Sequence, residues 1–204
     1  MKSYRFTHIA ERSLSMADPR WENIPKADLD NYNFSPSKGY PITEVRGVFS
    51  EEGLTLRFLS NERPEDILAR FHGRNESVCF DSCVEFFFAP LPEKDNRYMN
   101  IELSAGGGML IGLGSGRKER IRPPFELEDF EIETEILSDG WRAKFFVPFE
   151  FVKSFFGDFS NEFKGNFYKC GDQTACVHYG TWNLVDVPRP DYHRPEFFGE
   201  LYLG

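Results

Sequence analysis

The stretch EIETEILSDGWRAKFFVP, residues 131–148, predicts a β-hairpin and with it the fold class of the chain. Its first half alternates apolar side chains with glutamates, which is typical of a strand that buries one face. Asp139-Gly140 supplies a two-residue turn between the strands. On the polar face we expect Glu135 opposite Lys144, a cross-strand pair that contributes about 0.2–1 kcal/mol. The pairs expected on the apolar face are Ile136–Ala143, Thr134–Phe145 and Ile132–Val147.

Two further segments show the same alternation and carry polar groups. Residues 81–89 (DSCVEFFFA) form the strongest predicted strand. Residues 98–104 (YMNIELS) are expected to return antiparallel to it, with Asn100 and Glu102 on a polar face. A buried acid is costly unless it is solvated or paired, so Glu85 predicts a wet concave surface or a salt bridge. Other short strands are expected at residues 45–49, 54–59, 109–112, 166–170 and 199–203.

The remaining segments predict few helices. Residues 64–71 and 148–156 each begin with proline and precede a glycine, which is typical of a short helix. Residues 1–40 are polar and contain several prolines, so we expect an extended arm packed on the domain, with Trp21 buried as a plug. No alternation of strands and helices is visible. The sequence therefore predicts one all-β domain over residues 1–204, a jelly-roll-like antiparallel β-sandwich with one or two short helices.

Composition and charge exclude several classes of partner. The formal net charge of −9 argues against binding to a nucleic-acid backbone, which requires a positive surface. The longest apolar stretch, residues 84–91, is too short to span a membrane and contains Glu85. No signal peptide is visible, which predicts a cytoplasmic protein as written and an extracytoplasmic one if a leader was removed. The four cysteines are expected to be reduced thiols. The sequence does not predict an oligomeric state.

Several blocks of sequence resemble the family 9 carbohydrate-binding modules. The blocks are DSCVEFFF (81–88), YMNIE (98–102) with Gly106, Gly140-Trp141, Val147-Pro148, NFYKCGD (166–172), HYGTW (178–182) and YHRPEFFG (192–199). They stand in the order of the family and cover nearly the whole chain from about Trp21. The resemblance implies a non-catalytic β-sandwich that holds the end of a sugar chain between two tryptophans, with calcium ions supporting the loops.

The resemblance also implies site residues. Trp182 falls where one of the two tryptophans stands, and Glu85 and Asn100 fall on positions that bind sugar hydroxyls, although the related module carries an arginine at the second of these. Cys79-Phe80 occupies the place of the other tryptophan. A sugar site needs an aromatic plate and a few fixed polar groups. The candidates are Trp182 as the plate, with Phe80, Glu85, Asn100, Glu102, Asn183, His178 and His193 around the ligand.

Each candidate also has a structural interpretation. Trp182 could belong to the core, and Glu85 could be paired with Arg194 or Lys169. A histidine is most often a hydrogen-bonded structural group. The basic cluster at residues 117–122 is expected to be a solvated face.

The residue types also allow three other interpretations: an enzyme, a haem-binding domain and a zinc site. Glu85 and Glu102 on neighbouring strands could serve as the carboxylate pair of a glycoside-processing enzyme. A haem-binding redox domain would take its axial ligands from Met99, Met109, His178 and His193. A zinc site could draw on Cys170, Asp172, Cys176, His178 and His193, but their spacing matches no usual zinc pattern. No run of acidic residues typical of a calcium loop is present either, so we expect no metal or cofactor.

Overall fold

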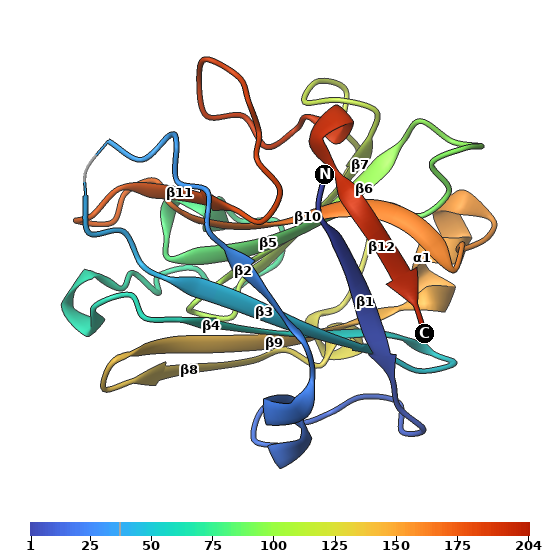
Figure 1. Ribbon diagram of the computed structural model, residues 1–204, viewed down its shortest axis with the longest axis horizontal. Helices are drawn as coiled ribbons and strands as arrows, with labels where there is room; N and C mark the ends of the chain where they lie inside the picture. The colour runs from blue at the N-terminus through green and yellow to red at the C-terminus, as the bar shows by residue number, and fades with distance from the viewer. Residues whose placement is uncertain (37) are drawn as a thin grey trace.

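The computed structural model describes residues 1–36 and 38–204, and in these residues twelve strands form two packed layers (Figure 1). Their order is β7-β6-β5-β10-β12-β1-β3-β4-β9-β8, with β11 beside β10 and β2 beside β3. The strands are β1 (Ser3–His8), β2 (Lys26–Leu29), β3 (Thr43–Phe49), β4 (Gly53–Ser60), β5 (Cys83–Ala89), β6 (Tyr98–Ser104), β7 (Met109–Gly114), β8 (Glu133–Leu137), β9 (Gly140–Pro148), β10 (Glu162–Gly171), β11 (His178–Thr181) and β12 (Gly199–Leu203). The predicted β-sandwich is confirmed.

Strand β1 connects the two layers. Its first residues pair in parallel with β12, and Thr7 and His8 pair in parallel with β3. The expectation of an extended arm without regular structure is therefore wrong for this part of the chain, and the sheet is mixed rather than purely antiparallel. The physical reason is the alternation of buried Tyr4 and Phe6 with exposed Arg5, which gives the segment one apolar face. Trp21 is buried, as predicted.

The hairpin of β8 and β9 forms, but its register differs from the prediction by two residues. Leu137 pairs with Gly140, so Glu135 lies opposite Arg142 instead of Lys144. Gly140 is the first residue of β9 and lies so close to Ser60 that a β-carbon would come within 2.1 Å of the Ser60 carbonyl oxygen. Because a shift of two residues is even, every side chain keeps its predicted face.

One of the two predicted helices forms. The helix α1 (Phe149–Phe156) follows Pro148 and ends at Gly157, whose φ of +83° is the left-handed conformation that glycine adopts readily. The described residues contain, besides α1, short 3₁₀ turns at Pro19–Asn23, Pro64–Asp66, Val78–Phe80, Leu127–Phe130 and Pro195–Phe197.

The helix expected at residues 64–71 is wrong beyond its first turn. The backbone amides of Arg70 and Phe71 donate to the carboxylate of buried Asp81. Leu68 likewise exchanges hydrogen bonds with Ser82. These donors are committed to a neighbouring segment, so they cannot form the regular bonds of a helix.

The two faces of β5 pack against different parts of the protein. Val84 and Phe86 belong to the large core between the layers. Glu85 and Phe87 point to the other face, where a second apolar cluster includes Tyr192 from the C-terminal segment. This segment, between β11 and β12, therefore covers part of the outer face of the β5, β6 and β10 layer (Figure 1).

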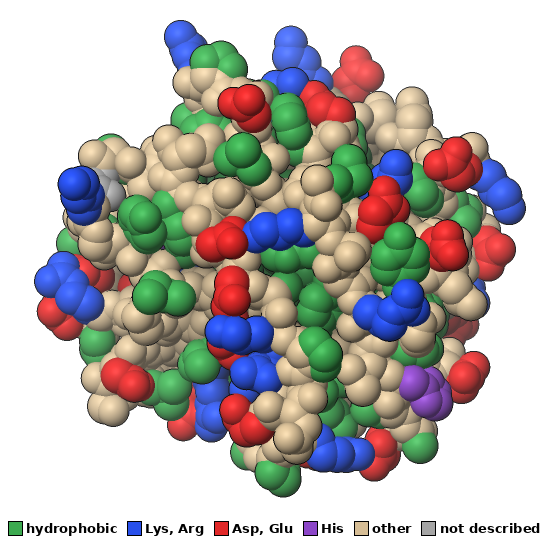
Figure 2. All heavy atoms as spheres, viewed as in Figure 1, with side chains coloured by type: hydrophobic (Ala, Val, Ile, Leu, Met, Phe, Trp, Pro, Cys, Tyr) green, Lys and Arg blue, Asp and Glu red, His purple; other side chains and the backbone are tan. Residues whose placement is uncertain are grey.

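The surface carries charges of both signs. On the face shown in Figure 2, lysines and arginines are interspersed with acidic side chains, and hydrophobic groups are scattered between them. Among the described residues no helix has the length and hydropathy needed to cross a membrane. Among the described residues, Cys79, Cys83 and Cys170 form no disulfide bond.

Candidate functional site

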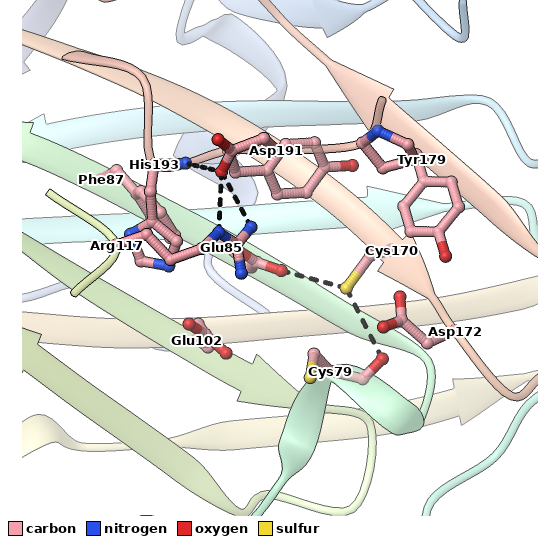
Figure 3. Close-up of a pocket in the computed structure, with 12 residues that line it drawn as sticks. Cys79, Glu85, Phe87, Glu102, Arg117, Cys170, Asp172, Tyr179, Asp191 and His193 are labelled. Carbon is pink, nitrogen blue, oxygen red and sulfur yellow. Dashed lines mark hydrogen bonds and ion pairs between the residues drawn. The ribbon is translucent and has the colours of Figure 1, made fainter. Parts of the chain in front are cut away.

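A pocket of about 240 Å³ lies between the outer face of β5, β6 and β10 and the C-terminal segment (Figure 3). The strands supply its floor, because residues of alternate positions point to this face. The segment that follows β10 supplies much of its wall. The lining residues are Cys79, Glu85, Phe87, Glu102, Arg117, Cys170, Asp172, Tyr179, Pro190, Asp191, Tyr192 and His193.

Two carboxylic acids form the centre of the floor. Glu85 on β5 lies directly opposite Glu102 on β6, and both side chains are more than nine-tenths buried. The thiol of Cys170 donates to Glu85 Oε1 over 3.0 Å, and Asn100 Nδ2 donates to Glu102 Oε1 over 2.8 Å. Within the described residues, neither acid forms an ion pair with a lysine or arginine. Both acids therefore keep acceptor capacity for a ligand.

The surroundings raise the pKa of both acids. Burial is the main cause for Glu85, and the adjacent Glu102 adds to it. Burial also raises the pKa of Glu102, against the opposing effect of Arg122. Two close carboxylic acids favour a state in which one is protonated. The pair can then donate one hydrogen bond and accept others, which is what a polyhydroxylated ligand requires.

One side of the pocket carries an ion pair and a histidine. Arg117 contacts Asp191 over 2.8 Å, and Asp191 also accepts from the backbone amide of His193. The ring of His193 is 2.8 Å from the hydroxyl of Tyr98 through Nδ1. Burial lowers the pKa of His193 to about 3, and nearby arginines add to this shift. The imidazole is therefore neutral at physiological pH and can exchange hydrogen bonds with an uncharged ligand.

The opposite side of the pocket is formed by Tyr179 and Asp172, as Figure 3 shows. Tyr179 is half-buried and presents an aromatic surface. Burial raises the pKa of Asp172, while a hydrogen bond from Tyr179 acts against that shift. Phe87 and Tyr192 add further apolar surface to the pocket. The pocket thus combines aromatic walls with a polar floor.

Trp182 is not part of this pocket, and its predicted role as an exposed plate is wrong. The indole is only 3% exposed and belongs to the core between the layers. It lies 5.4 Å from the ring of Phe167, and a β-carbon on Gly199 would lie 2.5 Å from it. The missing side chain at Gly199 creates the space that the indole fills.

The other predicted residues are divided between the pocket and structural positions. Glu85, Glu102 and His193 line the pocket. Asn100 is buried beside it, where it accepts from Arg120 and donates to Glu102. The remaining three residues do not line the pocket. Asn183 forms hydrogen bonds with the backbone of Lys2 and Phe197. Phe80 is 37% exposed, and His178 is fully buried.

His178 belongs to a buried polar cluster with Glu62 and Lys169. Lys169 Nζ lies 3.0 Å from Glu62 Oε2 and 2.6 Å from His178 Nε2, and the other ring nitrogen of His178 is 2.6 Å from the carbonyl of Cys176. The ammonium donates to Nε2, so the imidazole is neutral with its proton on Nδ1. The suggested pairing of Glu85 with Lys169 or Arg194 is wrong, because Lys169 pairs with Glu62 and Arg194 pairs with Glu196.

This cluster predicts an acid-sensitive contribution to stability. Burial, reinforced by Lys169, lowers the pKa of His178 from 6.5 to about 4. Below pH 6.5 the unfolded chain therefore takes up a proton that the folded protein excludes until about pH 4. The free energy of unfolding should fall as the pH drops through this window, by up to ~3 kcal/mol from this group.

Urea denaturation between pH 4 and pH 7 checks this expectation when wild type is compared with His178→Gln. The variant should be less stable near pH 7 and should show a flatter pH profile, because it lacks the titrating ring that faces Glu62 and Lys169. Parallel profiles for the two proteins would contradict the assignment.

Among the described residues, neither the alternative haem site nor the alternative zinc site is assembled, whereas Glu85 and Glu102 do lie together in the pocket. Met99 and Met109 lie in the core between the layers, whereas His193 lines the pocket on the outer face, so these side chains share no haem site. The ring of His178 is directed at Lys169 and the backbone of Cys176, away from a common zinc site with His193.

Sequence reasoning missed much of the pocket wall. The Arg117 side chain is 60% exposed, in agreement with the expected solvated face, but its pairing with Asp191 at the pocket was not expected. Strand alternation could have placed Cys170, because it stands directly opposite Cys83 on the face of Glu85. The positions of Tyr179 and Asp191 depend on the path of long loops, for which no local pattern exists.

Comparison with known proteins agrees with the architecture. Residues 16–203 match the sequence model described as Carbohydrate-binding family 9. No curated protein matches the chain. A structure of a proposed carbohydrate-binding protein from Bacteroides uniformis is 26% identical, with a TM-score of 0.79 over 100% of this chain and 99% of that one.

Two structures of a family 9 module from Caldicellulosiruptor kristjanssonii share the fold at 11% identity. The complex with glucose has a TM-score of 0.67 over 100% of this chain and 96% of that one. The complex with cellotriose has a TM-score of 0.68 over 99% of this chain and 93% of that one.

Proposed function

Because the chain belongs to carbohydrate-binding family 9, we propose that it is a non-catalytic carbohydrate-binding protein and that the pocket above Glu85 and Glu102 is its sugar site. One observation carries the proposal: two adjacent buried acids, which form no ion pair among the described residues, line a pocket with aromatic walls. Sugar rings present apolar C–H faces and a rim of hydroxyls, which such a pocket complements.

The dimensions favour a small ligand. A volume of about 240 Å³ is below the range of roughly 300–1,000 Å³ that drug-sized ligands occupy. The site therefore suits a single sugar residue, either free or at the end of a chain. Hydroxyls of this residue would bond to Glu85 and Glu102, while its C–H face lies along Tyr179 or Phe87.

Replacing Glu85 by glutamine tests the site. The substitution keeps the shape of the side chain but removes the acid, and a hydrogen bond to a charged group contributes about 1.5–3 kcal/mol. We expect the affinity for the best sugar in a calorimetric screen of mono- and oligosaccharides to fall at least about tenfold.

Glu162→Gln is the matched control, because this acid is exposed on β10 and outside the pocket. It should bind sugar like the wild type. Equal affinity in Glu85→Gln and the wild type would remove the proposed site. Aryl glycosides, assayed in parallel, should not be hydrolysed, since the proposed role of the acid pair is binding.

A further inference from the structure

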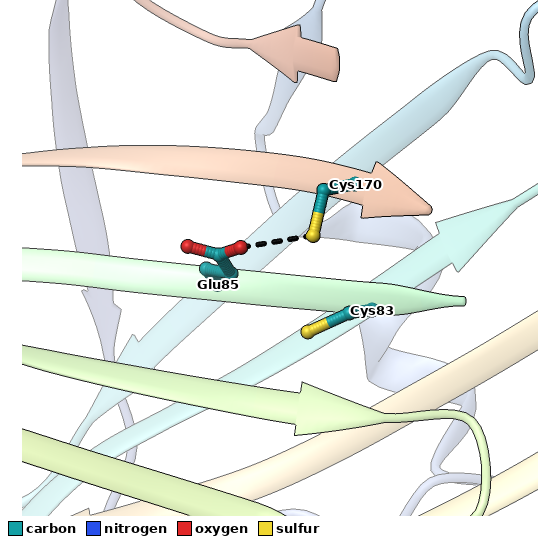
Figure 4. A group of neighbouring side chains, drawn as sticks. All are labelled: Cys83, Glu85 and Cys170. Carbon is teal, nitrogen blue, oxygen red and sulfur yellow. Dashed lines mark hydrogen bonds between the residues drawn. The ribbon is translucent and has the colours of Figure 1, made fainter. Parts of the chain in front are cut away.

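Three metal-binding side chains converge at the floor of the pocket (Figure 4). Cys83 and Glu85 are two residues apart on β5 and so share a face, and Cys170 lies directly opposite Cys83 on β10. The two sulfurs and one carboxylate oxygen lie within 4.8 Å of one another. In the described part of the chain, no other three Cys, His, Asp or Glu side chains converge as closely.

The carboxylate of Glu85 lacks a partner that would offset its burial. Glu85 lines the pocket and is only 3% exposed. Among the described residues, its side chain accepts a hydrogen bond only from the thiol of Cys170. A buried carboxyl group that lacks a cationic partner favours its protonated form, whereas a bound metal ion favours the ionised form. A cation at this position would supply the missing partner.

The donor set selects the kind of ion. Calcium takes six to eight oxygen ligands, so the calcium implied by the family resemblance does not fit two sulfurs and one carboxylate. Zinc accepts sulfur and carboxylate ligands in a tetrahedral arrangement, and sites with three protein ligands keep a fourth position open. Here Glu85 and Cys170 line the pocket whereas Cys83 does not, so the open position faces the pocket.

We propose that Cys83, Glu85 and Cys170 bind one Zn²⁺ ion at the pocket floor, with a water molecule or a ligand hydroxyl as the fourth ligand. Each thiol releases its proton as the sulfur binds the metal, and the proton that the two acids share is left on Glu102. Two thiolates, one carboxylate and the ion together carry one negative charge. Arg117, which pairs with Asp191, and the acids Glu102 and Asp172 are the other charged groups that line the pocket. The inference concerns a second property of the pocket and does not depend on sugar binding.

Metal titration of the full chain tests the proposal. The protein is kept reduced with a phosphine, freed of metal by a chelator and titrated with Cd²⁺, whose bonds to thiolates absorb in the ultraviolet. We expect one ion per chain, displacement of that ion by Zn²⁺, and release of two thiol protons per ion in calorimetry across buffers of different ionisation enthalpy. Absence of the absorption band or of proton release would overturn the site.

Substitutions then assign the ligands. Cys83→Ser and Cys170→Ser should each lower the metal affinity at least about tenfold, because a hydroxyl is a poor substitute for a thiolate on zinc. Cys176→Ser is the matched control and should bind metal like the wild type, since its sulfur lies outside the group. Equal metal binding in all three variants would contradict the assignment.

A measurement on the wild type alone covers the case in which a variant fails to fold. Mass spectrometry after alkylation should show Zn²⁺ protecting Cys170, which lines the pocket, while Cys176 reacts equally with and without the ion. Equal alkylation of Cys170 with and without Zn²⁺ would overturn the proposal. With chelator present, Cys83→Ser should still bind sugar, because Cys83 does not line the pocket. Failure of the metal site can therefore be distinguished from failure of the sugar site.

Discussion

Lys169→Met is expected to lower the free energy of unfolding by about 3–5 kcal/mol, because it leaves a buried carboxylate without its cation. Lys169 is fully buried, and its ammonium lies 3.0 Å from Glu62 Oε2. Ser82 and Trp141 also donate to Glu62, so the neutral donors would remain while the charge lost its partner. Urea denaturation monitored by fluorescence measures the change, with the slope m showing whether unfolding stays two-state.

A lysine on the same strand provides the control. Lys164 is 37% exposed and lies 3.8 Å from Glu200, so Lys164→Met should cost less than about 1 kcal/mol. The double variant Lys169→Met with Glu62→Gln removes both charges and should recover part of the loss. A Lys169→Met protein as stable as Lys164→Met would show that the buried pair contributes little to the fold.

Trp182→Ala should destabilise the protein by about 3–5 kcal/mol, the usual effect of removing a large aromatic ring from a core. The indole fills the space beside Gly199 and packs on Phe167, so its loss leaves a cavity between the layers. Thermal and urea denaturation measure the effect. The affinity of the folded protein for sugar should stay close to that of the wild type, because Trp182 faces the core rather than the pocket.

Tyr179→Ala is the reciprocal control. Tyr179 is half-buried and lines the pocket, so its removal should weaken sugar binding more than it lowers stability. If instead Trp182→Ala abolished sugar binding in a folded protein, the aromatic plate inferred from the family resemblance would be restored and the assignment of Trp182 to the core would fail.

The sequence predicted the strands well because alternation is a local property. Residues 98–104 and 199–203 are the bounds of β6 and β12 as observed. Alternation also placed Glu85 and Glu102 on one face, since their strands are adjacent in the chain and pair antiparallel. The floor of the candidate site could therefore be inferred from sequence.

The errors arose where distant parts of the chain decide the structure. The hairpin register depends on the approach of Gly140 to Ser60, and the burial of Trp182 depends on Gly199. The helix expected after Pro64 does not continue because Asp81, 10 residues beyond Phe71 and outside the predicted helix, accepts the backbone amides of Arg70 and Phe71. These contacts exist only once the fold is formed, so no window of sequence contains them.

The position of β1 between β12 and β3 has a consequence for biosynthesis. Ser3 pairs with Glu200, so β1 obtains this neighbour only after the chain between them has been translated. Until β12 is translated, one edge of β1 and part of one edge of β10 lack their partner strand. The unpaired N–H and C=O groups of such edges can pair with another chain, which promotes association between nascent chains. Such distant pairing also slows folding, because the closure entropy is lost before the contacts form. The strand β12, only five residues long, thus completes the sheet only after the segment that separates it from β1 has been translated.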